Sequence, residues 1–184
     1  IVGFDTNLHS RCFEDMMRAF ADALKILGHE AVYATQDSKP GRLIIFGGNN
    51  MTDPGKTMPK DAIIYNSEQV SAIHDPLKFI AGESYKERTI WDYSNINIAT
   101  LKAHGFEHVV HCPVGYTPSM TSIRPSKDED IDVLFYGSVG LRRREILDDI
   151  ENSGISVARL FGVYGKERDA IIARAKIVLN LHYY

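Results

Sequence analysis

Short apolar segments alternate with helical patterns in the last third of the chain, from residue 132 onwards. Residues 133–136 form a continuous apolar run, which is typical of a strand buried on both faces. A helical pattern follows and stops at Ser153-Gly154. The alternation then repeats, with a strand predicted over 155–161, a helix over 167–176 and a strand over 177–181. Strands that alternate with helices predict a parallel sheet joined by right-handed crossovers.

The first part of the chain shows the same alternation. A helix is predicted over 13–27, because apolar residues recur there at helical spacing: Phe13, Met16, Met17, Phe20, Leu24 and Leu27. We expect this stripe to be core rather than a ligand surface, with Ser10 as the N-cap and Gly28 closing the helix. The other predicted elements are strands over 1–4, 30–35, 42–46, 62–65, 89–91 and 108–112, a helical segment around 76–81, and a helix from Ser94 or Asn95 to His104.

The pattern changes between residues 117 and 130, where prolines, Ser and Thr side chains and the acidic run Asp128-Glu129-Asp130 gather. Such a segment is typical of an interdomain linker. We therefore predict a domain over 1–116, a linker over 117–130, and the first part of a second domain over 131–184. The predicted fold class is α/β, with two Rossmann-like domains built on parallel sheets and the second of them incomplete.

The composition is that of a globular protein and gives no sign of nucleic-acid binding or of a membrane span. The apolar fraction of 44% is enough for a sizeable core, and a net charge of -3 gives no sign of a nucleic-acid partner. No run approaches the ~18 apolar residues that span a bilayer. Residues 1–4 already have the pattern of a strand, so we expect the natural N-terminus to lie upstream. Cys12 and Cys112 cannot form a disulfide framework, which favours a reducing cytoplasm with both residues buried.

Polar side chains follow the predicted strands of the first domain. They are Asn7 and His9, Asn49 and Asn50, Asn66 and Glu68, and Asp92, Tyr93 and Ser94. Because the carboxyl ends of parallel strands emerge at one edge of a sheet, these clusters predict a binding cleft. The alternative is that these residues serve only as turns and caps, and the sequence leaves both readings open.

A second candidate site follows the strand at 133–136. Gly137 and Ser138 come directly after it, and Arg142 and Arg143 begin the next helix. Glycine lets the backbone approach an anion, a helix N-terminus offers N–H groups, and guanidinium is a forked donor, so the segment suits a phosphate. The pattern is a weak one, and basic residues that begin a helix are also common as a solvated surface.

The sequence gives no support for a dinucleotide cofactor, for a Walker A phosphate site or for a metal site. There is no G-x-G-x-x-G after the first strand and no Walker A sequence, so no nucleotide cofactor is predicted. His108 and His111 fall on opposite faces of a strand and make a poor chelate. The acidic run at 128–130 is interpreted as solvated linker, and no metal site is predicted.

Five stretches together resemble a family of bacterial glycosyltransferases of the two-Rossmann (GT-B) type. They are IIYNSEQ (63–69), WDYSNIN (91–97), CPVGYTP (112–118), DVLFYGS with RRREIL (132–147), and FGVYGKERDAIIARAKIVLNLHYY (161–184). The resemblance implies an N-terminal acceptor domain and a C-terminal domain that holds a nucleotide-sugar. It also implies sugar transfer without a bound metal or cofactor, from a nucleoside-diphosphate sugar to a glycan, lipid, protein or small-molecule acceptor.

The resemblance also assigns roles to residues. Gly137, Ser138, Arg142 and Arg143 face the diphosphate, and His182 and Tyr183 line the donor pocket. If the enzyme inverts, His9 is the first candidate for the base that deprotonates the acceptor and Glu68 the second. The alternative, which the sequence slightly favours for His9, is a surface loop residue near the start of a helix. Asn7, Asn66, Asp92, Tyr93 and Ser94 lie on the acceptor side.

Members of that family continue past the last strand seen here into elements that bring a donor-binding glutamate. We therefore expect no turnover from these 184 residues alone. We also expect an apolar surface at 177–179 that is exposed in these 184 residues and is covered either by self-association or by further segments of the protein. The alternative function is a non-catalytic α/β module that binds a nucleotide or a sugar. The sequence does not name the sugar, the acceptor or the stereochemistry.

Overall fold

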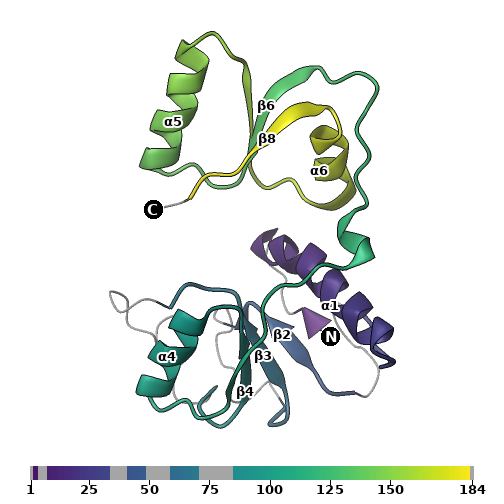
Figure 1. The fold of residues 1–184 in the computed structure, drawn as a ribbon, viewed down its shortest axis with the longest axis vertical. Helices are drawn as coiled ribbons and strands as arrows, with labels where there is room; N and C mark the ends of the chain where they lie inside the picture. Colours follow the sequence, from purple (N-terminus) through teal and green to yellow (C-terminus); the bar gives the residue numbers. More distant parts are fainter. Residues whose placement is uncertain (1, 4–7, 34–40, 49–58, 71–84, 183–184) are drawn as a thin grey trace. The chain divides into compact units, whose positions relative to one another are not determined.

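The computed structural model describes residues 2–3, 8–33, 41–48, 59–70 and 85–182. Side chains are described from residue 11 onwards within these ranges. The chain divides into two compact units, Ile1–Met120 and Thr121–Tyr184, coloured purple to teal and green to yellow in Figure 1. The division falls within the predicted linker, in which a short 3-10 helix, η4, spans Pro118–Met120.

The first unit contains a parallel sheet with the strand order β1-β2-β3-β4-β5. The strands are β1 (Val2–Gly3), β2 (Ile44–Phe46), β3 (Ile63–Asn66), β4 (Thr89–Asp92) and β5 (Val109–His111). The register pairs Asn66 with Asp92, and Asp92 with His111. The last residues of β3, β4 and β5 therefore lie side by side at the carboxyl edge of this sheet.

Helices cover both faces of this sheet. Helix α1 (Glu14–Ile26) packs Met17 and Phe20 onto one face, and α4 (Asn95–Ala103) packs Leu101 onto the other. The strands are apolar on both sides for this reason, as expected of a buried parallel sheet. The Phe20 ring meets Phe46 at a centroid distance of 5.3 Å and Tyr65 at 4.6 Å. The prediction that the apolar stripe of α1 is core is confirmed for these two α1 residues.

The two ends of α1 differ from the prediction. A 3-10 helix, η1 (Leu8–Phe13), precedes α1, so Phe13 is the N-cap residue and the prediction of Ser10 at that position is wrong. At the other end Leu27 is 72% exposed, so the stripe loses contact with the core there. Gly28 does close the helix, since its φ of 87° lets its N–H bond to the carbonyl of Lys25.

The strand predicted over 30–35 is wrong for residues 30–33. These residues pair with none of the five strands, and Val32 is 52% exposed. The segment instead packs Ala31 and Tyr33 against the α1 side of the core, with the Arg18 guanidinium 5.1 Å from the Tyr33 ring centroid. Residues 34–35 and the helical segment predicted around 76–81 lie outside the described residues.

The second unit is a three-stranded parallel sheet with the order β7-β6-β8. Its strands are β6 (Ile131–Tyr136), β7 (Val157–Leu160) and β8 (Ala175–Leu179). Helices α5 (Leu141–Asn152) and α6 (Gly165–Ile172) join them and lie on either side of the strands (Figure 1). The chain steps from β6 to β7 and then crosses back to the far side of β6, so the strand order reverses between β6 and β8. The prediction of an α/β chain with parallel sheets is confirmed.

Strand β8 begins and ends two residues earlier than predicted. The register places Ala175 opposite Ile131, and a Lys176–Asp132 ion pair crosses between the two strands. Beyond Leu179 the main chain binds side chains of α5 instead of a strand. Ile177 is 56% exposed and Val178 41%, although consecutive strand residues point to opposite faces. The predicted exposed apolar surface is therefore confirmed for these two residues.

Candidate functional site

Asp92 is the centre of a polar cluster at the carboxyl edge of the first sheet. Its side chain has no exposed surface. The carboxylate accepts hydrogen bonds from Asn66 Nδ2 at 2.6 Å, from the Ser94 main-chain N–H at 2.8 Å and from Asn97 Nδ2 at 3.1 Å. Burial raises the pKa of Asp92, and these three donors oppose that rise. A carboxylate held in this way is structural, because a substrate cannot reach it.

Asn97 links this cluster to the turn after β3. It is 1% exposed and lies in the first turn of α4, where Ser94 is the N-cap. Its Nδ2 also donates to the carbonyl of Glu68 at 2.9 Å, and its Oδ1 accepts from the N–H of Val70 at 2.9 Å. The sequence analysis missed Asn97. An asparagine inside the first helical turn was the available signal, since asparagine is unfavourable within helices unless its amide has a partner.

The structure brings together three of the predicted acceptor-side residues: Asn66, Asp92 and Ser94. Their hydrogen bonds are those of turns and caps, which favours the second of the two readings that the sequence left open. Tyr93 is 38% exposed, and its carbonyl lies 3.2 Å from His111 Nε2. Asn7 and the side chain of His9 lie outside the described residues.

Glu68 takes part in this cluster through its main chain and not through its carboxylate. Its main-chain N–H donates to Asn66 Oδ1 at 3.1 Å, and its carbonyl accepts from Asn66 Nδ2 at 3.1 Å. The backbone is therefore fixed by the cluster, while the side chain is only half-buried. Among the described carboxylates at this edge, Glu68 combines a fixed backbone with a side chain that reaches solvent.

A second cluster lies at the carboxyl edge of the β7-β6-β8 sheet. Arg143 Nη1 donates to the main-chain carbonyl of Ser138 at 2.8 Å, and its Nη2 donates to that of Leu181 at 2.7 Å. Its guanidinium also lies over the Phe135 ring, 5.4 Å from the centroid. Arg142 Nη1 donates to the carbonyl of His182 at 2.8 Å. The two arginines thus hold the segment after β8 beside the loop after β6.

Backbone geometry adds to the positive character of this edge. Gly137 has a φ of 139°, which lets the chain turn away from β6. Helix α5 has Gly140 as its N-cap residue, without a side-chain cap and without an acidic residue in its first turn. The N–H groups of that turn and the two guanidinium groups therefore face the same edge, an arrangement that favours anions. Of the predicted donor residues, Gly137, Ser138, Arg142, Arg143 and His182 are brought together, and Tyr183 lies outside the described residues.

The described residues offer little support for metal or thiol chemistry. Asp130, from the predicted acidic run, pairs with Arg174, which lowers the pKa of its carboxyl. Within the described residues, no group of three or more His, Cys, Asp or Glu could hold a metal. Cys12 is exposed, so the prediction that it is buried is wrong, whereas Cys112 is half-buried. No described helix is both long and apolar enough to cross a membrane.

Comparison with known proteins finds relatives in Acanthamoeba polyphaga mimivirus. The chain is 29% identical to uncharacterized protein L140 over 180 residues, which are 93% of this chain and 57% of L140. It is 29% identical to uncharacterized protein L137 over 141 residues, 69% of this chain and 18% of L137. A stretch of 56 residues is 45% identical to uncharacterized protein L138. No protein-family profile and no solved structure matches the chain.

The chain thus spans a little over half of L140 and less than a fifth of L137.

Proposed function

We propose that the chain contributes acceptor-side and donor-side parts of a GT-B type glycosyltransferase, with a nucleoside-diphosphate sugar as the donor and no bound metal. The observation that supports this best is the reversal of strand order between β6 and β8. In open α/β sheets, ligands bind at the carboxyl ends of the strands where the order reverses. Gly137, Ser138, Arg142, Arg143 and His182 all lie at that edge.

The chemistry of the edge suits a diphosphate. Both arginines bind main-chain carbonyls, which are neutral acceptors. A phosphate oxygen is an anionic acceptor and forms a stronger, charge-assisted hydrogen bond with guanidinium. In the proposal, Arg142 and Arg143 therefore exchange carbonyl acceptors for phosphate oxygens when the donor binds. As the sugar leaves, negative charge grows on the diphosphate, and fixed cations stabilise it.

If the transfer inverts, the acceptor side must supply a base, for which His9 and Glu68 are the two candidates; the side chain of Glu68 is the one that the structure describes. Glu68 follows β3, has a fixed backbone and a half-exposed side chain. Asp92 is not a candidate, because its carboxylate is fully buried and has three donors of its own.

Nucleotide binding tests the donor site. Calorimetry with uridine, guanosine and adenosine diphosphates is run on the wild type and on Arg142→Ala and Arg143→Ala. Each charge-assisted contact contributes about 1.5–3 kcal/mol, so the affinity for the preferred nucleotide should fall about tenfold or more in either variant. Arg144→Ala is the matched control, because Arg144 is exposed on the same helix and its loss removes the same charge. Absent binding, or an equal loss in all three variants, contradicts the proposal.

A non-catalytic nucleotide- or sugar-binding module is the second candidate function. It is favoured by the burial of Asp92, which removes one carboxylate from the chemistry available at the acceptor edge. Nucleoside-diphosphate release from a panel of nucleotide-sugars distinguishes the two. Because no turnover is expected from these 184 residues alone, the assay uses the natural full-length protein. Release that falls in Glu68→Gln supports the transferase, and nucleotide binding by that full-length protein without any release supports the module.

A further inference from the structure

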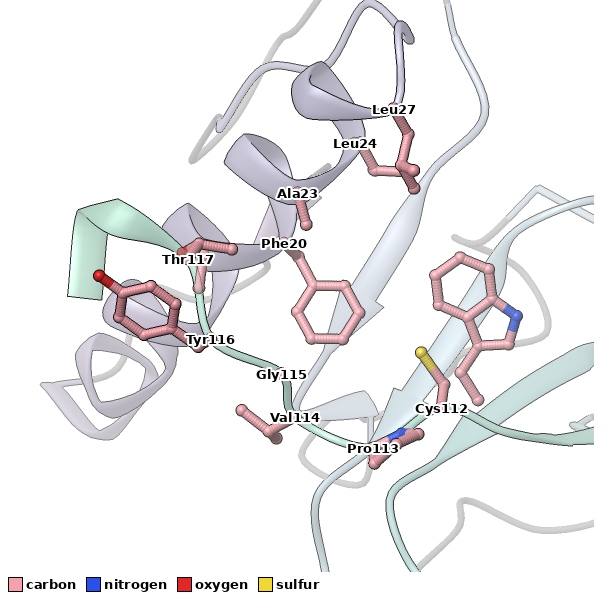
Figure 2. A pocket seen from close by; sticks show the side chains of 12 residues that line it. Phe20, Ala23, Leu24, Leu27, Cys112, Pro113, Val114, Gly115, Tyr116 and Thr117 are labelled. Atoms are coloured by element: carbon pink, nitrogen blue, oxygen red, sulfur yellow. The ribbon is translucent and has the colours of Figure 1, made fainter.

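An apolar pocket lies in the first unit. It has a volume of about 270 Å³ and lies between α1, β4 and the segment that follows β5. Figure 2 shows Phe20, Ala23 and Leu24 projecting from the helix, with Cys112 and Pro113 across from them. Every residue that lines the pocket is uncharged. The buried hydroxyl of Thr117, at one end, already has a partner in Ser119 Oγ at 2.9 Å.

Packed aromatic rings form one wall of the pocket. The Phe20 and Trp91 rings lie nearly parallel, at a centroid distance of 6.3 Å and an angle of 29°. The Phe20 ring also packs edge-to-face on Tyr65. The Tyr65 hydroxyl donates to the carbonyl of Cys112 at 3.2 Å. This hydrogen bond also fixes the start of the segment that forms the opposite wall. The pocket is therefore built from packed core residues on one side and an anchored segment on the other.

The rim of the pocket is apolar as well. Leu27 is 72% exposed, Val114 46% and Tyr116 74%, and all three line the pocket. Single exposed apolar residues are common, but several around one concave opening indicate a binding surface. The uncharged lining disfavours an ionic ligand, since a charge placed there would lose its hydration without gaining a partner.

We propose that this pocket binds a neutral apolar group of a small molecule, about the size of a substituted benzene ring. An apolar protein cavity of about 150 Å³ takes up benzene, and pockets for whole ligands run to about 300–1,000 Å³. A volume of about 270 Å³ lies between these limits and suits one ring with a short substituent. Because the proposed function makes this unit the acceptor side, the group belongs to the acceptor; that assignment rests on the proposed function.

Trp91 provides a direct readout, because it is the single tryptophan of the chain and it lines the pocket. The probe is 4-bromobenzyl alcohol, a neutral aromatic whose bromine quenches indole fluorescence. We expect saturable quenching by this probe, in contrast to the non-saturable quenching by acrylamide, which is polar. Ala23→Phe fills the pocket from α1, and Ala99→Phe makes the same change at an exposed position of α4. The affinity for the probe should fall at least tenfold in the first variant and stay unchanged in the second.

Cys112 gives an independent measurement that does not depend on fluorescence. In a Cys12→Ser background, the rate of Cys112 alkylation by iodoacetamide should fall severalfold at a saturating concentration of the probe. Quenching that does not saturate, with the same slope in both phenylalanine variants, overturns the proposal. A dimer that Ala23→Phe converts to a monomer, measured by light scattering, also overturns it, because the pocket is then filled by a second copy.

The experiment separates this inference from the proposed function. Saturable probe binding without nucleoside-diphosphate binding supports the pocket and overturns its assignment to an acceptor. Nucleotide binding without saturable probe binding overturns the pocket and leaves the proposed donor site in place.

Discussion

The carboxyl edges of the two sheets use polar residues in opposite ways. In the first unit, neutral amide and N–H donors surround a buried carboxylate, that of Asp92. In the second, two guanidinium groups bind neutral main-chain carbonyls at an edge that solvent reaches. In the first arrangement, protein donors surround a negative charge. In the second, two cations donate to main-chain carbonyls, which bind guanidinium more weakly than a phosphate oxygen does.

Polar residues at strand ends can therefore have two different roles. Both edges look like binding sites in the sequence, because glycine, asparagine, serine and charged residues follow the strands in both. The two edges differ in how deeply the charged group is buried and in which groups form its hydrogen bonds. A buried carboxylate that accepts hydrogen bonds from neutral protein donors is out of reach of a ligand, while guanidinium groups that donate to main-chain carbonyls at an exposed edge can also bind an anion.

The largest effect should come from the core beneath the first edge. Phe20→Ala removes a ring that is 8% exposed and packs on Phe46, Tyr65 and Trp91, so the free energy of unfolding should fall by about 3–5 kcal/mol. Leu27→Ala, at the exposed end of the same helix, should change it by at most about 0.5 kcal/mol. Denaturant unfolding of both variants measures this, and equal small effects would show that α1 does not cover the sheet.

A smaller effect is expected at the buried carboxylate. Asp92→Asn replaces one acceptor oxygen by an NH₂ group that faces the donors of Asn66 or Asn97, and should cost about 1–3 kcal/mol of unfolding free energy. Asn95→Asp is a suitable control on the exposed side of α4. A variant as stable as the wild type would mean that the cluster is not structural.

The destabilisation by Asp92→Asn should depend on pH. Burial raises the pKa of Asp92, so the folded state binds the proton more tightly than the unfolded state. The contribution of Asp92 to stability must then fall as pH rises from about 4 through the raised pKa. The destabilisation by Asp92→Asn should therefore shrink over this range, and a destabilisation that grows with pH contradicts the account.

Gly137→Ala should have an effect of similar or smaller size in the second unit. A Cβ there would lie 3.7 Å from the Phe135 ring, an ordinary contact, so the cost comes from the φ of 139°. Strain of this kind amounts to about 1–2 kcal/mol. Gly41→Ala is the control, since it meets nothing within 4 Å and needs no positive φ. Equal unfolding midpoints for both variants would show that the loop after β6 relaxes.

The smallest effect is expected at the exposed Asp130–Arg174 pair. Exposed ion pairs contribute little, so Asp130→Asn should leave the unfolding midpoint unchanged within error. Arg174 lowers the pKa of Asp130, so any contribution is present above the ordinary pKa of an aspartate and is lost as pH falls through the lowered value. This is the opposite sign to Asp92. A clear loss of stability in Asp130→Asn at neutral pH would contradict it.

Local patterns in the sequence predicted the eight strands of the two sheets, the main helices and the polar character of both edges, but they also predicted a strand at 30–33 that the structure does not contain. They could not predict the partners, because these lie far apart along the chain. Asn97 binds the carbonyl of Glu68, 29 residues away, and Arg143 binds that of Leu181, 38 residues away. The apolar pocket was missed for the same reason, since it forms only when α1 meets the segment after β5. The end of β8 was misplaced because Leu181 is apolar but binds an arginine rather than a strand.

Hydrogen–deuterium exchange with a saturating concentration of uridine, guanosine or adenosine diphosphate, whichever binds most tightly, tests the contrast between the two edges most directly. The account predicts slower exchange in peptides that cover 137–143 and 177–182, because the nucleotide binds the arginines at the edge of the second sheet. It predicts unchanged exchange in peptides that cover 63–70 and 89–97, around Asp92. Protection of the Asp92 cluster, with none at 137–143, would contradict the account.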